Sequence, residues 1–121
     1  MADVNVERRQ SPRIKTRIPL EYKNLHKDSA DGRGVQVKDI SEGGVRFTSS
    51  EFLSLANRLV VTINIPTTAR QIKAIAKIAW IKKLPSGDLY EVGNQFLEIS
   101  KEDKQEVARY VKTVVDMNIT I

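Results

Sequence analysis

Three arginines close to the N-terminus are the residues of this sequence best suited to bind an anion. Arg8, Arg9 and Arg13 lie within the segment Glu7–Arg13. A guanidinium group presents its N–H donors as a planar fork that matches two oxygens of a phosphate, and it also matches the O6 and N7 edge of guanine. A lysine ammonium matches neither group equally well. Most arginine clusters are simply hydrated, so this cluster by itself does not establish a site.

A second group of polar residues follows about 25 residues later, in the segment Asp39–Gly44. The carboxylate of Asp39 can accept hydrogen bonds from the N1–H and N2–H groups of guanine, a donor pattern that adenine lacks. Ser41 adds a hydroxyl on the same side of an extended chain. Gly43 and Gly44 allow positive φ and a close approach of the backbone to a ligand. The same pattern also marks a strand that ends in a tight turn held by side-chain to backbone hydrogen bonds, so both interpretations stay open here.

Catalytic and metal-binding chemistry finds few suitable residues in this sequence. There is no cysteine, and the single histidine, His26, lies in a polar stretch without a paired acid. Structural zinc sites need Cys or His ligands in fours, and Ser41 has no histidine at a spacing that could activate it as a nucleophile. The phosphate-binding loop GxxxxGK[ST] and the dinucleotide fingerprint GxGxxG do not occur. We therefore expect no enzyme activity, no metal site and no cofactor.

The composition is that of one ordinary globular domain with a basic N-terminal end. The 121 residues are 40% hydrophobic and 29% charged, with a formal net charge of +5. Residues 1–27 hold seven basic and three acidic residues, a net of +4. Such an excess addresses nucleic acid, membrane headgroups or a nucleotide, or serves only solubility. Because the sequence has neither an apolar signal segment nor a long apolar stretch, we expect a cytoplasmic protein that does not span a membrane.

The elements that must position these residues are short strands followed by one helix. Residues 1–16 contain few large apolar groups and no sustained period, so we expect a flexible arm there. Alternation of apolar and polar residues predicts strands at 18–22, 35–40, 45–48 and 59–65. Residues 71–84 fit a strand at period two and a helix at period 3.6. The β-rich context and the Pro85–Asp88 turn leading to residues 90–99 favour the strand.

A helix is predicted to begin after Ser100, whose hydroxyl can cap the first turn, with Asp103 three residues further on. Its apolar stripe consists of Val107, Tyr110, Val111, Val114 and Val115. Six strand candidates at short spacing and one helix predict an all-β fold with a C-terminal helix, a small antiparallel barrel over residues 17–121. The aromatic residues are assigned to its core rather than to base stacking: Tyr22, Phe47, Trp80, Phe96 and Tyr110.

The two polar motifs, in this order and at this distance, resemble the signature of the PilZ family, R-x-x-x-R followed by [D/N]-x-S-x-x-G. The matching positions are Arg9 and Arg13 in the first half and Asp39, Ser41 and Gly44 in the second. Two strands are also similar to those of the family, the apolar–Trp strand at Ile78–Trp80 and the G-x-x-F strand at Gly93–Phe96. The resemblance covers most of residues 7–112.

This resemblance implies a six-stranded antiparallel barrel of the PilZ type and a receptor for cyclic di-GMP. It implies that the ligand is held by Arg8, Arg9, Arg13, Asp39, Ser41, Gly43 and Gly44. Arg8 resembles an extra arginine in family members that bind an intercalated ligand dimer, so two ligands per chain are expected. Arg46, beside the second motif, either reaches the ligand or faces solvent. Since nothing is left over for an output domain, the receptor is expected to act on an unidentified effector protein.

Two alternative functions compete with this one. A small basic nucleic-acid-binding barrel would present several exposed aromatic residues interleaved with Lys and Arg, and the aromatic residues here are mostly in core register. A PilZ-like interaction module without ligand binding would lack the motifs, which are intact. We therefore do not expect nucleic acid as the partner.

Overall fold

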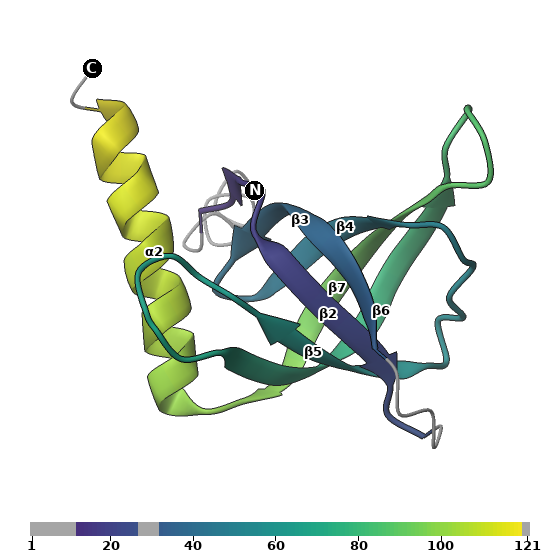
Figure 1. The fold of residues 1–121 in the computed structure, drawn as a ribbon, viewed down its shortest axis with the longest axis horizontal. Coiled ribbons are helices and arrows are strands. Elements are labelled where there is room, and N and C mark those ends of the chain that lie inside the picture. Colours follow the sequence, from purple (N-terminus) through teal and green to yellow (C-terminus); the bar gives the residue numbers. More distant parts are fainter. Residues whose placement is uncertain (1–11, 27–31, 120–121) are drawn as a thin grey trace, which may run out of the picture.

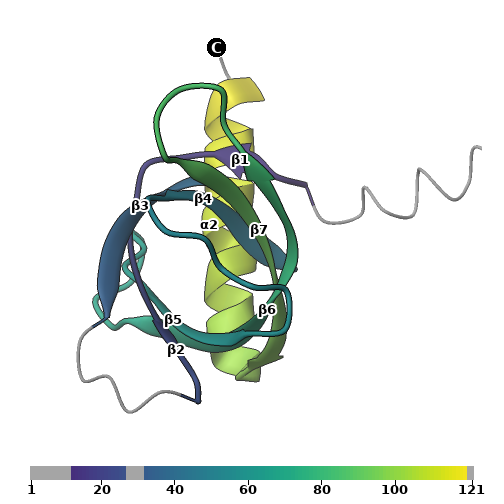
Figure 2. The ribbon, with the colours of Figure 1, turned by 90° about the vertical axis from the view of Figure 1, so that its right-hand side faces the viewer.

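The computed structural model describes residues 12–26 and 32–119, without the side chains of the last two. Within these ranges the chain forms seven strands and one helix, labelled as in Figures 1 and 2. They are β1 (Ile14–Lys15), β2 (Pro19–Asn24), β3 (Arg33–Ser41), β4 (Gly44–Ser49), β5 (Arg58–Ile63), β6 (Ile72–Lys83), β7 (Tyr90–Ile99) and α2 (Lys101–Ile119).

Six of these strands close into an antiparallel barrel. Their order is β3–β2–β5–β6–β7–β4, and a further pairing of β4 with β3 closes the ring. All these pairings are antiparallel. Figure 2 looks along the barrel and shows the strands as a ring in front of the helix. The predicted fold, a six-stranded antiparallel barrel followed by a C-terminal helix, is confirmed.

The core follows from the alternation that predicted the strands. In β5, Leu59, Val61 and Ile63 are completely buried, while the residues between them face outward. Burial of each of these side chains stabilises the fold by about 1.5–3 kcal/mol, which is the main force that closes the barrel. The fold therefore depends on a face of apolar side chains with a period of two.

The ambiguous stretch from residue 71 to residue 84 is a strand, as predicted. Ile72, Ala74, Ala76 and Ile78 are buried at period two, whereas Ala79 of the competing helical stripe is exposed. A turn then leads into β7. In this turn Gly87 takes a positive φ of 68°, which a residue with a side chain would adopt only with strain.

The start of α2 uses the predicted cap only in part. Ser100 Oγ accepts a hydrogen bond from the backbone N–H of Asp103 at 3.1 Å. The carboxylate of Asp103 pairs instead with Arg70 and accepts a bond from the backbone N–H of Lys73 at 3.2 Å. Asp103 therefore ties the first turn of the helix to the β5–β6 connection and to β6.

The helix covers one mouth of the barrel (Figures 1 and 2). Its predicted apolar stripe faces the core, where Val107, Tyr110 and Val111 are buried. The phenol of Tyr110 also shares a hydrogen bond of 2.5 Å with the hydroxyl of Thr16. The side of α2 that faces the barrel is thus joined to the segment just after β1.

The expected arm of residues 1–16 differs at its C-terminal end. Ile14 and Lys15 form β1, which pairs with the second half of β3, and Ile14 is buried in the core. A two-residue strand has no period to detect, which is why the sequence pattern missed it. Residues 1–11 lie outside the described residues, and their flexibility stays a prediction.

Candidate ligand-binding site

Asp39 lies where three strands meet. The pairing of β3 with β4 shifts register between Val37 and Asp39, and past this irregularity Asp39 pairs with Lys15 of β1 and with Arg46 of β4. Asp39 is only 5% exposed. An ionised carboxylate this deeply buried requires partners, so the residues around it are the first place to look for a site.

The two sequence motifs meet at this carboxylate. Arg13 Nη1 lies 3.5 Å from Asp39 Oδ1, although the two residues are far apart in the chain. Arg13 itself is half exposed, so its guanidinium remains accessible to a ligand. The first two arginines of the predicted site, Arg8 and Arg9, lie outside the described residues.

Arg46 is the principal partner of Asp39. Its Nε and Nη2 atoms each lie 2.7 Å from Asp39 Oδ2, and its Nη1 lies 2.9 Å from Glu91 Oε2. Partial burial alone lowers the pKa of Arg46, but the hydrogen bonds and charges of Asp39 and Glu91 outweigh it and hold that pKa above its usual value. Arg46 is therefore paired with two carboxylates and only partly exposed, and its contact with a ligand stays a prediction.

Ser41 holds the turn between β3 and β4. Its hydroxyl is almost fully buried and accepts a hydrogen bond from the backbone N–H of Gly43 at 3.2 Å. This is the turn-holding arrangement that the sequence left open. A hydroxyl that accepts one bond still carries its own proton, so Ser41 can also donate to a ligand.

The two glycines of the turn differ from the expectation. Neither has a positive φ; among the described residues only Gly87 does. A Cβ on Gly44 would lie 1.9 Å from the backbone oxygen of Asn94 in β7, so the neighbouring strand requires a glycine there. A Cβ on Gly43 would meet only Ser41 Oγ, at 3.9 Å, and Gly43 is exposed.

A shallow cavity of about 330 Å³ lies beside these residues. The sequence-predicted residues that line it are Arg13, Ser41, Gly43 and Gly44, and they are joined by Ala79, Trp80 and Gly93 among others. The structure therefore brings four of the seven predicted residues to one cavity. Asp39 does not line the cavity itself, but it contacts Arg13, which does.

Trp80 was assigned to the core, and that prediction is wrong. Trp80 is 38% exposed and lines the cavity. Its indole lies over Gly93, where a Cβ would come within 2.3 Å of the ring. Phe47, Tyr22 and Tyr110 are buried as predicted, and Phe96 is partly buried against the core. The cavity thus offers an aromatic face next to a guanidinium group.

Asn94 is a further polar residue that the sequence analysis missed. It is 6% exposed, and neither polar atom of its side chain has a hydrogen-bond partner among the described residues. Its strand partners, Val45 and Ile78, are core residues. The available signal was a polar residue at a buried position of the alternating strand β7. Asn94 also lines the cavity, beside Trp80 and Gly93.

A basic groove of about 720 Å³ lies over β3, β4 and the segment from Lys15 to Arg17. Its cationic side chains are Lys15, Arg17, Lys38 and Arg46, and no acidic residue lines it. Lys15, which lines the groove, is two residues from Arg13, which lines the cavity. Together they form a positively charged surface next to an aromatic one.

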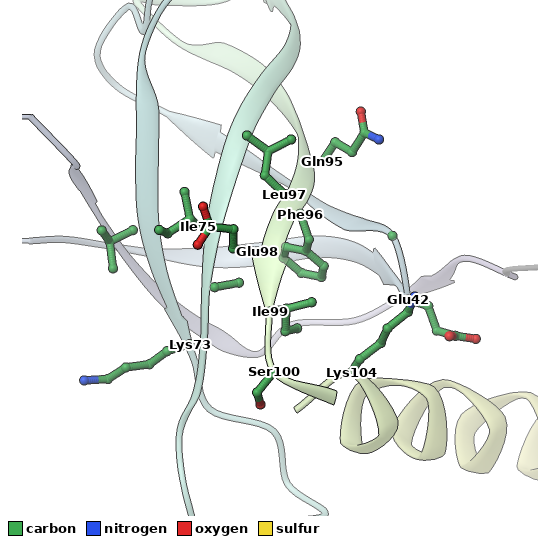
Figure 3. A pocket seen from close by; sticks show the side chains of 13 residues that line it. Glu42, Lys73, Ile75, Gln95, Phe96, Leu97, Glu98, Ile99, Ser100 and Lys104 are labelled. Atoms are coloured by element: carbon green, nitrogen blue, oxygen red, sulfur yellow. The ribbon is translucent and has the colours of Figure 1, made fainter. Parts of the chain in front are cut away.

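A larger cavity, about 870 Å³, lies elsewhere (Figure 3). Of the predicted site residues it contains only Gly43, and the rest of its lining comes from β5, β6, β7, the start of α2 and Glu42. In Figure 3 the side chains of Lys73, Gln95 and Glu42 point in different directions. Small-molecule sites have a few polar groups that converge, so this cavity is a weaker candidate despite its size.

The sequence matches a family model that describes the PilZ domain, over residues 7–113. This range is most of the 121-residue chain, so the protein belongs to the PilZ domain family. The family that the two motifs indicated is thereby confirmed. No curated protein matches the sequence significantly.

Several solved structures share this fold at low sequence identity. The inhibitor of motility MotI/DgrA of Bacillus subtilis has a TM-score of 0.74 at 20% identity, over 89% of this chain and 52% of its own. The PilZ domain of YcgR from Escherichia coli, solved with c-di-GMP, has a TM-score of 0.62 at 16% identity, over 94% and 99%. The MrkH–c-di-GMP complex of K. pneumonia has a TM-score of 0.60 at 19% identity, over 92% and 52%. The chain thus spans about half the length of MotI/DgrA and of MrkH.

Two absences hold for residues 12–26 and 32–119. No helix there is long and apolar enough to cross a membrane. In the same ranges, no group of three His, Cys, Asp or Glu side chains is placed to hold a metal ion.

Proposed function

We propose that this protein is a receptor for cyclic di-GMP that signals to a partner protein, and that it is not an enzyme. The observation that carries this proposal is the contact between Arg13 of the first motif and Asp39 of the second, at a cavity lined by Ser41, Gly43 and Gly44. Two structurally similar proteins, the PilZ domain of YcgR and MrkH, were solved with c-di-GMP, which gives the ligand class.

The proposed roles follow from the chemistry of each group. Arg13, together with Arg8 and Arg9, takes the phosphates and the O6 and N7 edges of guanine. Asp39 accepts from the N1–H and N2–H donors of one guanine through Oδ1, the oxygen that accepts no hydrogen bond from a described residue. Ser41 donates its free proton.

Trp80 and the basic groove extend the proposed site. The exposed face of the indole is suited to stack on a purine, a contact worth about 1–3 kcal/mol in other nucleotide sites. A ligand with two bases and two phosphates is larger than one purine, and the groove offers Lys15, Arg17 and Lys38 beside the cavity. This additional cationic space supports the expectation of two ligands per chain.

Isothermal titration of the whole protein tests the proposal. Cyclic di-GMP is the ligand, cyclic di-AMP tests base recognition, and a single-stranded DNA oligonucleotide tests the nucleic-acid alternative. We expect saturable binding of cyclic di-GMP, at two ligands per chain, with no comparable binding of the other two. Equal binding of DNA would favour the basic barrel, and no binding at all would favour an interaction module without ligand.

A further inference from the structure

Five charged side chains of alternating sign form a row across neighbouring strands of the barrel, next to the proposed site. They run from Lys38 through Glu91, Arg46 and Asp39 to Arg13, over strands β3, β4 and β7 to the segment before β1. The outer contacts are the longer ones, 3.7 Å from Lys38 Nζ to Glu91 Oε2 and 3.5 Å from Arg13 Nη1 to Asp39 Oδ1. The central contacts, which Arg46 makes, are 2.7–2.9 Å.

Arg46 is held more tightly than any other member of this row. Its Nε and Nη2 atoms both bind Asp39 Oδ2, and its Nη1 binds Glu91 Oε2. All three nitrogens of the guanidinium group are therefore engaged by two carboxylates. The side chain is three-quarters buried, so solvent competes weakly for these bonds.

The two oxygens of Asp39 are left in different states by this arrangement. Oδ2 is occupied by Arg46, whereas Oδ1 accepts no hydrogen bond from any described residue and faces Arg13. A carboxylate that turned freely about its last torsion would expose both oxygens in many directions. One that is fixed by a bidentate partner presents one oxygen in one direction, without a further cost of ordering when a ligand arrives.

We infer that Arg46, itself held by Glu91, is a positioning residue that fixes the carboxylate of Asp39 with Oδ1 toward the ligand and so sets the preference for guanine over adenine. This inference rests on the proposed function. It assigns to Arg46 no contact with the ligand. Arg46 also keeps Asp39 compensated when Arg13 turns from the carboxylate to a phosphate, since a buried charge left alone is strongly destabilising.

Cyclic di-GMP and cyclic di-AMP distinguish positioning from simple charge attraction, because they carry the same phosphates and differ in their bases. If Arg46 only contributed positive charge, its loss would weaken both ligands by the same factor. If it positions Asp39, its loss weakens cyclic di-GMP and leaves cyclic di-AMP nearly unchanged. The hybrid cyclic GMP–AMP, with one guanine, falls between the two.

The test compares Arg46→Gln with Lys82→Gln, which removes an equal charge. Lys82 is exposed, pairs across strands with Glu91, and makes no ion pair among the described residues. We expect Arg46→Gln to reduce the ratio of the two affinities about tenfold or more, the scale of a charge-assisted hydrogen bond, and Lys82→Gln to leave it unchanged. Arg46→Lys keeps the charge without the fork, so we expect it to restore little of the ratio.

A second readout needs no ligand. In the NMR spectrum of the free protein, the Nε–H proton of Arg46 should exchange slowly with water, and it should exchange fast in Asp39→Asn. An unchanged affinity ratio in Arg46→Gln, with wild-type binding intact, overturns the positioning role and leaves the proposed function standing. A wild-type protein that binds none of the three dinucleotides overturns both.

Discussion

Arg13 and Asp39 contribute very differently to the folded molecule, although they touch. The side chain of Arg13 is 53% exposed, and an ion pair with one exposed partner stabilises a protein by less than about 1 kcal/mol. Asp39 is buried and bound to Arg46, so its removal leaves a cation without its main partner. Variants of the two residues should therefore separate ligand binding from stability.

Replacing Arg13 with alanine should weaken cyclic di-GMP binding by about 1.5 kcal/mol or more, the usual scale for hydrogen bonds to charged groups. The melting temperature should hardly change. Titration calorimetry and thermal unfolding measure the two effects, and Lys101→Ala, at the exposed start of α2, removes an equal charge as a control. We expect the same loss for Arg9→Ala. Wild-type affinity in Arg13→Ala would remove Arg13 from the site.

Asp39→Asn should lower both the affinity for cyclic di-GMP and the stability. The amide keeps one acceptor oxygen and replaces the other by a donor, which can face neither Arg46 nor the N–H groups of guanine. We expect a loss of about 1–3 kcal/mol in the free energy of unfolding, measured by urea denaturation. Asp88→Asn, at the exposed β6–β7 turn, is the matched control. A destabilised variant with unchanged affinity would show that Asp39 only holds the strands together.

Of the two glycines in the β3–β4 turn, Gly44 has no room for a side chain beside the neighbouring strand, whereas Gly43 has room for one. A Cβ at Gly44 would overlap the backbone of β7, so Gly44→Ala should separate β4 from β7 locally and destabilise the protein by about 1–3 kcal/mol or more. Gly43→Ala serves as the control, because its added Cβ would only touch Ser41 Oγ at an ordinary contact distance of 3.9 Å. Urea denaturation of the two variants measures the difference, and equal stabilities would contradict the close pairing.

A second prediction for the strands concerns the phenol of Tyr22, which links β2 to the end of β4. It donates a hydrogen bond to Glu51 at 2.8 Å and shares one with Ser49 at 3.1 Å. Burial, chiefly, raises the pKa of Tyr22 from 10.0 to about 12, with Glu51 adding to the increase and the Ser49 bond opposing it. The folded chain therefore keeps this proton in a pH range where the unfolded chain has lost it.

The stability that this raised pKa contributes is complete below pH 10 and is lost as the pH rises toward 12. We expect wild type to lose about 2 kcal/mol more than Tyr22→Phe between pH 9.5 and pH 11.5, since a pKa difference of one between the folded and unfolded chain corresponds to about 1.4 kcal/mol. Urea denaturation at the two pH values measures the loss. Tyr90→Phe is the control, and parallel losses in wild type and Tyr22→Phe would contradict the raised pKa.

The strands that alternation predicted were found because one face of each is buried. Period two was visible in residues 59–65 and, with help from the following turn, in residues 71–84. β1 was not predictable in this way, because only Ile14 marks it as buried and a single residue has no period. The true demand on Gly44 was equally hidden, since it depends on the backbone of Asn94 in a strand 50 residues away in the sequence.

At the site, the residue types were predictable and their mutual contacts were not. Spacing and chemistry identified Arg13, Asp39 and Ser41. The pairing of Asp39 with Arg46 follows a register shift in β3, and the exposure of Trp80 follows a register shift in β6 between Ile78 and Trp80. Both depend on how strands pair across the barrel, which a local pattern does not contain.

For the molecule as a whole, the charge and the low apolar content of the N-terminal residues predict a change of order on binding. Ordering costs roughly 1–2 kcal/mol per residue, which phosphates bound to Arg8, Arg9 and Arg13 would offset. Hydrogen exchange should show that amides from Glu7 to Arg13 gain protection with cyclic di-GMP, while those of Val60–Ile65 stay protected throughout. Equal protection of the N-terminal amides with and without ligand would contradict this ordering on binding, but it would not contradict the binding itself.

The hydrogen bond between Thr16 and Tyr110 joins the proposed site to α2 by a short path. Thr16 is three residues from Arg13, and Ile14 between them is packed in the core. A displacement of the Arg13 backbone is therefore transmitted over only three residues to α2, the helix that covers the barrel mouth. The segment around β1 thus connects a cation of the proposed site, Arg13, with α2 through the anchored residues Ile14 and Thr16.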